Sequence, residues 1–239
     1  MSPYPSELIK TAGIEIPLIG FYDAPDAKPF APVVEPKPGT RICVFAFYKR
    51  WLKGESLRVT RDNFGCGGAG RSWCGVEARS REEFIRFLVD EEGLKASHDL
   101  MNRWIDSSPP YRQEHENVLV GPLRESQYAH LKTVTFFVNP DQLALMMLGA
   151  QYESAPEDPP PVISPFGSGC MQLVGVFKDL GVPQAVIGGT DIAMRQYLPP
   201  DVLAFTVTKP MYERLASLDE RSFLTKPFWK RLRKAREGN

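Results

Sequence analysis

The sequence lacks an excess of charge of either sign, and it has only three histidines and four cysteines. Lysine plus arginine and aspartate plus glutamate number 29 each, so the formal net charge is zero. Balanced charge argues against a broad basic surface, and we therefore expect no nucleic-acid partner. No His-x-x-x-His pair, Ser-His-Asp combination, nucleophile elbow or phosphate loop occurs. Because these hydrolase and phosphate-binding motifs are absent, the sequence indicates no particular reaction.

Long apolar runs are also missing. No stretch approaches the roughly 20 residues that cross a bilayer, and Met1–Pro5 is not a basic segment followed by an apolar one. We expect a cytoplasmic protein without a membrane span. Four cysteines in a reducing compartment do not make a disulfide scaffold, which leaves buried inert thiols, metal ligation or redox chemistry.

The length of 239 residues and the hydrophobic content of 43% suit one domain over residues 1–239. Residues 1–40 contain eight prolines, which predicts a proline-rich N-terminal arm with one short strand near residues 14–22. Residues 219–239 form a basic C-terminal tail, typical of a solvated last helix; a membrane-surface or anion-binding tail is the alternative. A homo-oligomer is compatible with these features, and no internal repeat is visible in the sequence.

Helical and extended patterns alternate along the rest of the chain. Thr40 and Gly54 bound the first predicted helix, Ser80 and Glu83 offer a capping box, and Ser168 is the expected cap of a later helix. The predicted helices are 41–53, 81–92, 97–107, 141–150, 169–180, 191–197 and 210–218. The predicted strands, besides 14–22, are 56–60, 133–138, 162–166, 184–188 and 202–208. This order predicts an α/β or α+β fold: a mixed β-sheet with flanking helices in a single domain.

The stretch 63–75 places Cys66 and Cys74 in a predicted loop with five glycines. Glycine lets a ligand approach the backbone closely, so we expect a ligand site here. Its candidate ligand-binding residues are Gly65, Gly67, Gly68, Gly70 and Arg71. Three of these glycines also match Gly-x-Gly-x-x-Gly, but no apolar strand precedes them, which argues against a dinucleotide site.

The cysteines carry the main functional hypothesis. Cys43 and Cys170 lie in the first turns of the predicted helices 41–53 and 169–180, where the helix dipole lowers a thiol pKa from about 8.5 into the range of roughly 3.5–7.5. Gly167 and Gly169 leave the backbone beside Cys170 open. Cys43, Cys66, Cys74 and Cys170 could supply four thiolates, or three with an open position, to an iron–sulfur cluster or zinc.

Other interpretations remain open. No Cys-x-x-Cys pair occurs, and all four thiols could be buried and inert, Cys74 beside Trp73 most of all. A nucleophilic Cys66 is a further interpretation. Asp191 and Arg195, one helical turn apart, are typical of a surface ion pair but could face a ligand. The alternative function is a non-enzymatic binder of a small anionic ligand at the glycine-rich loops, using Arg71, Asp191 and Arg195.

The order of these pieces resembles the domain-of-unknown-function 169 family of archaeal cysteine-rich-type proteins, over about residues 8–218. The matching pieces are Cys43 in a helix ending near Gly54, Asn63-Phe64-Gly65-Cys66-Gly67-Gly68, Phe137-Val138-Asn139-Pro140-Asp141-Gln142, and Gly167-Ser168-Gly169-Cys170. Asp191 and Arg195 resemble a further acidic and basic pair. The resemblance implies a metal or iron–sulfur site at Cys43, Cys66 and Cys170, with Cys74 peculiar to this chain or a subgroup, and implies no particular activity.

Overall fold

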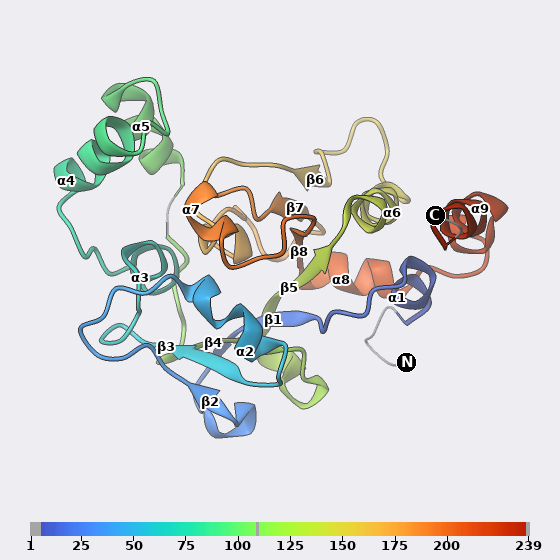
Figure 1. The fold of residues 1–239 in the computed structure, drawn as a ribbon, viewed down its shortest axis with the longest axis horizontal. Helices are drawn as coiled ribbons and strands as arrows, with labels where there is room; N and C mark the ends of the chain where they lie inside the picture. Colours follow the sequence, from blue (N-terminus) through green and yellow to red (C-terminus); the bar gives the residue numbers. More distant parts are fainter. Residues whose placement is uncertain (1–5, 109, 238–239) are drawn as a thin grey trace.

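The computed structural model describes residues 6–108 and 110–237, in which eight strands form one mixed sheet with flanking helices (Figure 1). The predicted fold class is confirmed. The strands lie side by side in the order β2-β3-β4-β1-β5-β8-β7-β6. They are β1 Ile19–Ala24, β2 Val33–Val34, β3 Ser56–Val59, β4 Asn117–Pro122, β5 Leu131–Val138, β6 Val162–Ile163, β7 Ala185–Gly188 and β8 Leu203–Thr208.

The sheet consists of two copies of one four-strand unit. In β1–β4 the first strand pairs antiparallel with the fourth, the fourth antiparallel with the third, and the third parallel with the second. Strands β5–β8 pair in the same way. The units join where β1 pairs antiparallel with β5, so an approximate two-fold axis passes between these strands, perpendicular to the sheet. The repeat lies in the strand topology, and the amino-acid sequence shows no matching internal repeat.

Regular helices cover one face of the sheet. Their apolar side chains, such as Leu8, Met146 and Met211, form one buried cluster with the sheet residues Phe136 and Phe205. The helices on the sheet are α6 Pro140–Gln151 and α8 Lys209–Ala216, and α1 Ser6–Ala12 packs against α8. Helix α9 Pro227–Glu237, which was predicted in the basic tail, lies at the end of the molecule past α6 and α1 (Figure 1). Trp229 packs against this cluster and donates to the Thr11 carbonyl, so the tail is attached to the domain.

Short helices cover the other face, over a second buried cluster that includes Trp51, Trp73 and Met194. These are α2 Tyr48–Trp51, α3 Gly67–Cys74 and α7 Ile192–Arg195, together with short 3₁₀ segments. The segments after β2, β3, β6 and β7 all pack on this face, as the two-fold axis requires.

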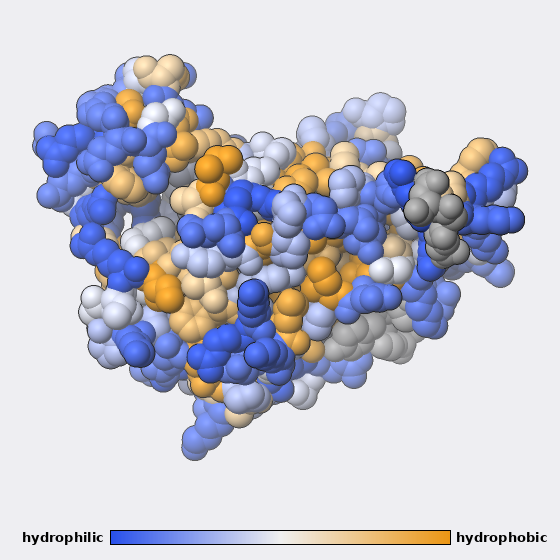
Figure 2. Space-filling view, in the orientation of Figure 1, coloured by the Kyte–Doolittle hydropathy of each residue, from blue (hydrophilic) through white to orange (hydrophobic). Residues whose placement is uncertain are grey.

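Residues 81–107 form a helical wing that stands away from the sheet (Figure 1). It consists of α4 Arg81–Arg86, a π-helical turn Phe87–Glu91 and α5 His98–Ser107, around a small apolar cluster of its own. Its surface is largely hydrophilic on the outer side (Figure 2). Trp104 joins the wing to the rest of the protein: its ring lies 5.0 Å from that of Phe166, and its Nε1 donates to the Phe166 carbonyl at 3.3 Å.

Local signals predicted several elements correctly. The Ser80–Glu83 capping box begins α4, Ser97 caps α5, and Asn139 with Gln142 caps α6. Strands β3, β5, β7 and β8 also lie where they were predicted. No helix among residues 6–108 and 110–237 has both the length and the apolar content that a membrane crossing needs.

Other expectations were wrong. The Thr40 hydroxyl donates back to the Lys37 carbonyl at 2.6 Å and does not cap a helix, so 41–53 is replaced by a 3₁₀ segment Val44–Phe47 followed by α2. The predicted helix 169–180 is reduced to a 3₁₀ turn at Met171–Leu173. Gly175 disfavours a helix in this segment, and the Thr133 hydroxyl donates a hydrogen bond to the Leu173 carbonyl, which is then not free to accept a helical hydrogen bond.

Three further regions differ from the prediction. The expected glycine loop contains helix α3. The proline-rich arm holds helix α1 and the central strand β1, which begins five residues later than predicted, at Ile19. Strand β4 was not predicted at all; its glycine and its terminal proline weaken the extended pattern.

Candidate functional site

A cavity of about 370 Å³ lies between the short helices and the helical wing. Cys43, Cys66 and Cys170, from three distant segments, all line it. Four glycines open the backbone beside them: Gly67, Gly68, Gly167 and Gly169. The aromatic lining residues are Phe45, Phe84, Phe87, Trp104 and Phe166. The cavity volume lies within the usual range for small-ligand sites.

Cys66 is the N-cap residue of α3. Its Sγ accepts a hydrogen bond from the Ala69 amide at 3.4 Å. The pKa of Cys66 falls to about 6, mainly because the Cys170 thiol hydrogen-bonds to it; burial opposes this, and backbone amides of Ala69, Val44 and Gly68 support it. Cys66 is therefore a thiolate at neutral pH, facing the cavity.

Cys170 is the buried partner of this thiolate. Its Sγ lies 3.2 Å from the Ser168 hydroxyl and 3.7 Å from that of Ser72. Its carbonyl accepts from Trp73 Nε1 at 2.7 Å. The pKa of Cys170 is raised because it is the hydrogen-bond donor to Cys66 and because it is buried.

Gly68 makes this thiol pair sterically feasible. A Cβ at Gly68 would lie 2.9 Å from the Cys170 sulfur, 3.4 Å from the Ser168 hydroxyl and 3.9 Å from the Cys66 sulfur. Contacts below 3.0 Å are not tolerated without a shift. The predicted importance of this glycine thus has a geometric basis.

Cys43 precedes the 3₁₀ segment Val44–Phe47 and is half-buried. Its pKa rises to about 11, chiefly through burial, with smaller contributions from the negative charges of Cys66 and Asp191. The expectation of a lowered pKa at Cys43 and Cys170 was therefore wrong. Neither residue begins an α-helix, whereas Cys66, expected in a loop, caps one.

Cys74 lies apart from the other three thiols. It is buried against the sheet, lines a separate pocket beside Tyr111, and has its pKa raised to about 12, mainly by burial. Gly65 and Gly70 also lie off the cavity lining: Gly65 contacts the Ile42 segment with a φ of 72°, and Gly70 packs against Phe64.

The predicted charged ligands have protein partners. Arg71 lines the cavity, but its Nη1 pairs with Glu77 at 2.6 Å. Asp191 lines the cavity and caps α7, accepting from the Ala193 amide at 3.0 Å and from the Gly169 amide at 3.0 Å. Arg195 is not part of the lining. It donates to four backbone carbonyls, those of Gly189, Pro199, Pro200 and Val202.

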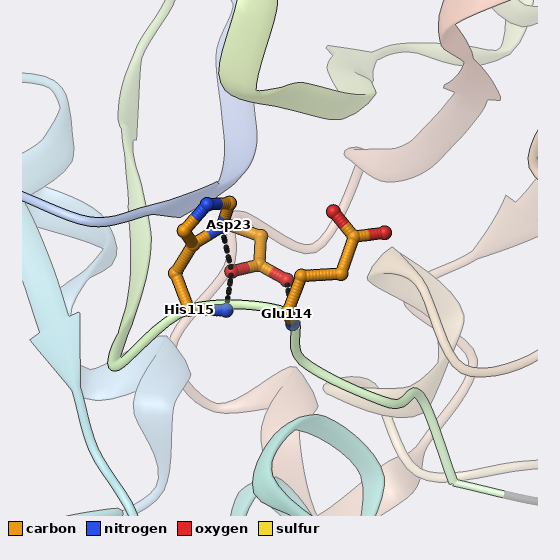
Figure 3. A group of neighbouring side chains, drawn as sticks. All are labelled: Asp23, Glu114 and His115. Carbon is orange, nitrogen blue, oxygen red and sulfur yellow. Dashed lines mark hydrogen bonds and ion pairs between the residues drawn. The ribbon is translucent and has the colours of Figure 1, made fainter.

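A second polar cluster, Asp23, Glu114 and His115, was missed from the sequence (Figure 3). One ligand atom from each lies within 4.8 Å of the others, close enough for a shared cation. The fully buried Asp23 carboxylate accepts from Tyr111 Oη at 2.7 Å, the Glu114 and His115 amides at 2.6 and 2.9 Å, and His115 Nδ1 at 3.1 Å.

This Asp23 cluster is internally satisfied. Glu114 Oε2 forms an ion pair with Lys132 Nζ at 3.0 Å. The pKa of Tyr111 is raised, first by burial and second by its hydrogen bond to the Asp23 carboxylate. The cluster ties the segment before β4 to strand β1. No sequence signal could reveal it, because Asp23 is about 90 residues from its partners.

Comparison with known proteins places the chain in a family. Neither the curated proteins nor the solved structures contain a match. The model of the domain-of-unknown-function 169 family, described as uncharacterised ArCR, matches residues 13–217. This range contains all three cavity thiols and both four-strand units. The chain therefore belongs to the domain-of-unknown-function 169 family.

Proposed function

We propose that this protein binds an iron–sulfur cluster or a soft metal ion through Cys43, Cys66 and Cys170, for redox or sensing work. The observation that supports the proposal is the meeting of three thiols, from three distant segments, at one cavity. Thiolates are the preferred ligands of soft metals, and three cysteines that line one cavity can bind the same metal centre.

The spacing of the sulfur atoms favours a cluster over a single zinc ion. Three thiolates on one zinc, with bonds of about 2.3 Å, lie at most about 4.6 Å apart. The three sulfur atoms do not form a group with all separations within 4.8 Å. A cluster has several irons, each of which takes its own thiolate, so it bridges wider separations.

The alternative, an anionic ligand held by Arg71, Asp191 and Arg195, has weaker support. Arg71 already pairs with Glu77, and Arg195 is occupied by backbone carbonyls outside the cavity. Space for a small molecule remains between the thiols and the aromatic wing residues. A ligand there would lie next to a metal centre with an open position.

Anaerobic purification, followed by reconstitution with iron and sulfide, tests the proposal. We expect bound iron and acid-labile sulfide with visible absorbance in the wild type, and their loss in Cys66→Ser. Cys74→Ala is the matched control and retains both, because Cys74 lies in another pocket. Colourless, metal-free wild type, or equal loss in Cys74→Ala, would contradict the proposal.

A glycine pair sharpens the test. Gly68→Ala forces a methyl group onto the Cys170 sulfur, whereas a Cβ at Gly67 meets only the Ala78 methyl at 3.8 Å. Both substitutions raise helix propensity equally. We expect Gly68→Ala to weaken metal retention by about 10–100-fold, the usual effect of disturbing the surroundings of a ligand, and Gly67→Ala to leave it unchanged. Equal retention in both variants would count against the thiol pair as ligands.

A further inference from the structure

The two-fold repeat of the sheet relates the cavity residues in pairs. Cys43 follows β2 and Cys170 follows β6, and each is the residue before a 3₁₀ segment. Cys66 follows β3 and Asp191 follows β7, and each is the N-cap residue of the next α-helix. Asp191 therefore occupies, in the second unit, the position that Cys66 occupies in the first.

The hydrogen bonds around these two caps repeat as well. Cys66 Sγ accepts from the Ala69 amide in its own helix, and Asp191 Oδ1 accepts from the Ala193 amide in its own. The backbone amide of Val44, in the segment that carries Cys43, lies near the Cys66 side chain. Asp191 Oδ2 accepts from the Gly169 amide, in the segment that carries Cys170. Each cap residue thus lies against the cysteine-bearing segment of its own unit.

The contacts between the units follow the same symmetry. The Cys66 and Cys170 side chains are neighbours that line the cavity, and rotation about the axis converts this pair into Asp191 and Cys43. Asp191 and Cys43 line the same cavity. The four side chains therefore surround one space as two symmetry-related pairs.

We propose that Asp191 is the fourth ligand of the metal centre, completing a two-fold symmetric set with Cys43, Cys66 and Cys170. This inference rests on the proposed function. A carboxylate offers about four lone-pair sites, and the two amide hydrogen bonds to Asp191 use only two of them. A carboxylate is a harder ligand than a thiolate, so the iron that Asp191 binds is held less strongly than the irons bound by cysteine.

Substitutions at Asp191 separate ligation from helix capping. Asparagine caps helices as well as aspartate does, so Asp191→Asn preserves α7 but removes the anionic ligand. Asp191→Cys places a cysteine at the position equivalent to Cys66 and so supplies a fourth thiolate. Asp179→Asn is the control: Asp179 is an exposed aspartate that also accepts a backbone amide, from Gly181 at 2.7 Å.

The experiment compares the reconstituted full-length variants by iron release to a chelator, electron paramagnetic resonance and midpoint potential. We expect Asp191→Asn to release iron at least about 10-fold faster than the wild type. Asp191→Cys should retain iron at least as well, with a changed resonance spectrum and potential, and Asp179→Asn should match the wild type. The resonance spectrum and the midpoint potential report the ligands of the iron, so they carry the test; the release rate alone would also respond to loss of the hydrogen bond from the Gly169 amide to Asp191.

Two failures are distinguishable. If the wild type holds iron, Cys66→Ser loses it, and both Asp191 variants keep the wild-type spectrum and potential, then Asp191 is not a ligand and only this inference is overturned. If the wild type binds no iron after reconstitution, the proposed function fails, and the inference fails with it.

Discussion

The thiol cluster and the Asp23 cluster both bring metal-binding residue types together, yet they differ in how their polar atoms are satisfied. Asp23 is fully buried and accepts four hydrogen bonds, and its neighbour Glu114 has a lysine partner. The thiol cluster opens onto a cavity and holds a thiolate whose main partner is another thiol.

This difference separates a structural cluster from a candidate site. A carboxylate saturated by local donors gains little from a cation and loses existing hydrogen bonds on binding one. A thiolate supported by a second thiol exchanges one proton for a metal, because metal binding releases protons from its ligands. The partners of an atom thus indicate its role better than its residue type does.

The largest expected effect breaks the Asp23 cluster. Asp23→Ala leaves several buried donors without an acceptor, and we expect a loss of about 3 kcal/mol in the free energy of unfolding. Metal content per folded chain should not change. Urea denaturation with metal analysis measures both quantities.

Glu114→Gln is the control for that substitution. The Glu114 side chain is 64% exposed, so losing its ion pair should cost less than about 1 kcal/mol. A loss of metal in Asp23→Ala, with the fold intact, would refute the distinction between the two clusters.

The second effect concerns thiol reactivity in the metal-free protein. The pKa of Cys66 is about 6 and that of Cys43 about 11, so at pH 7 their thiolate fractions differ by about 10⁴-fold. The lower nucleophilicity of a low-pKa thiolate offsets roughly half of this difference on a logarithmic scale. We expect Cys66 to be alkylated by iodoacetamide about 100-fold faster than Cys43, as measured by peptide mass spectrometry.

The pH dependence of this reaction has a definite sign. Cys66 is deprotonated above pH about 6, so its alkylation rate should fall as the pH drops through that value. The rate for Cys43 should still rise at pH 9, because its pKa is raised. Equal rates at pH 7, or a Cys66 midpoint near the ordinary value of 9, would show that the thiol pair does not form.

The smallest effect isolates the hydrogen bond that holds Cys170. Trp73→Phe removes the bond from Nε1 to the Cys170 carbonyl, whereas the buried Trp51 Nε1 has no partner. Both substitutions remove similar volume, so the difference between them combines the lost Trp73 hydrogen bond with the relief of the unpaired Trp51 N–H. We expect Trp73→Phe to cost about 1 kcal/mol more than Trp51→Phe in chemical denaturation. An equal cost would mean that this bond adds nothing to the position of Cys170.

Local sequence features predicted what depends on a few adjacent residues. The Ser80–Glu83 capping box forms as predicted because its bonds join residues three positions apart. The same reasoning failed at two other predicted caps. The Thr40 hydroxyl donates to the Lys37 carbonyl, and after Ser168 the Leu173 carbonyl accepts a hydrogen bond from the Thr133 hydroxyl. A competing local turn decided the first case, and a tertiary hydrogen bond decided the second.

By itself, the sequence determined the mixed sheet with its helices, the glycines beside the cysteines, and the family, because these depend on composition, short-range spacing and the order of the segments. Only the tertiary structure decided that Cys74 lies apart, that Cys66 caps a helix, and that Asp191 occupies the position equivalent to Cys66. The reason is physical: strand pairing across the two-fold axis brings together residues more than 100 positions apart, and no local pattern records which strands pair.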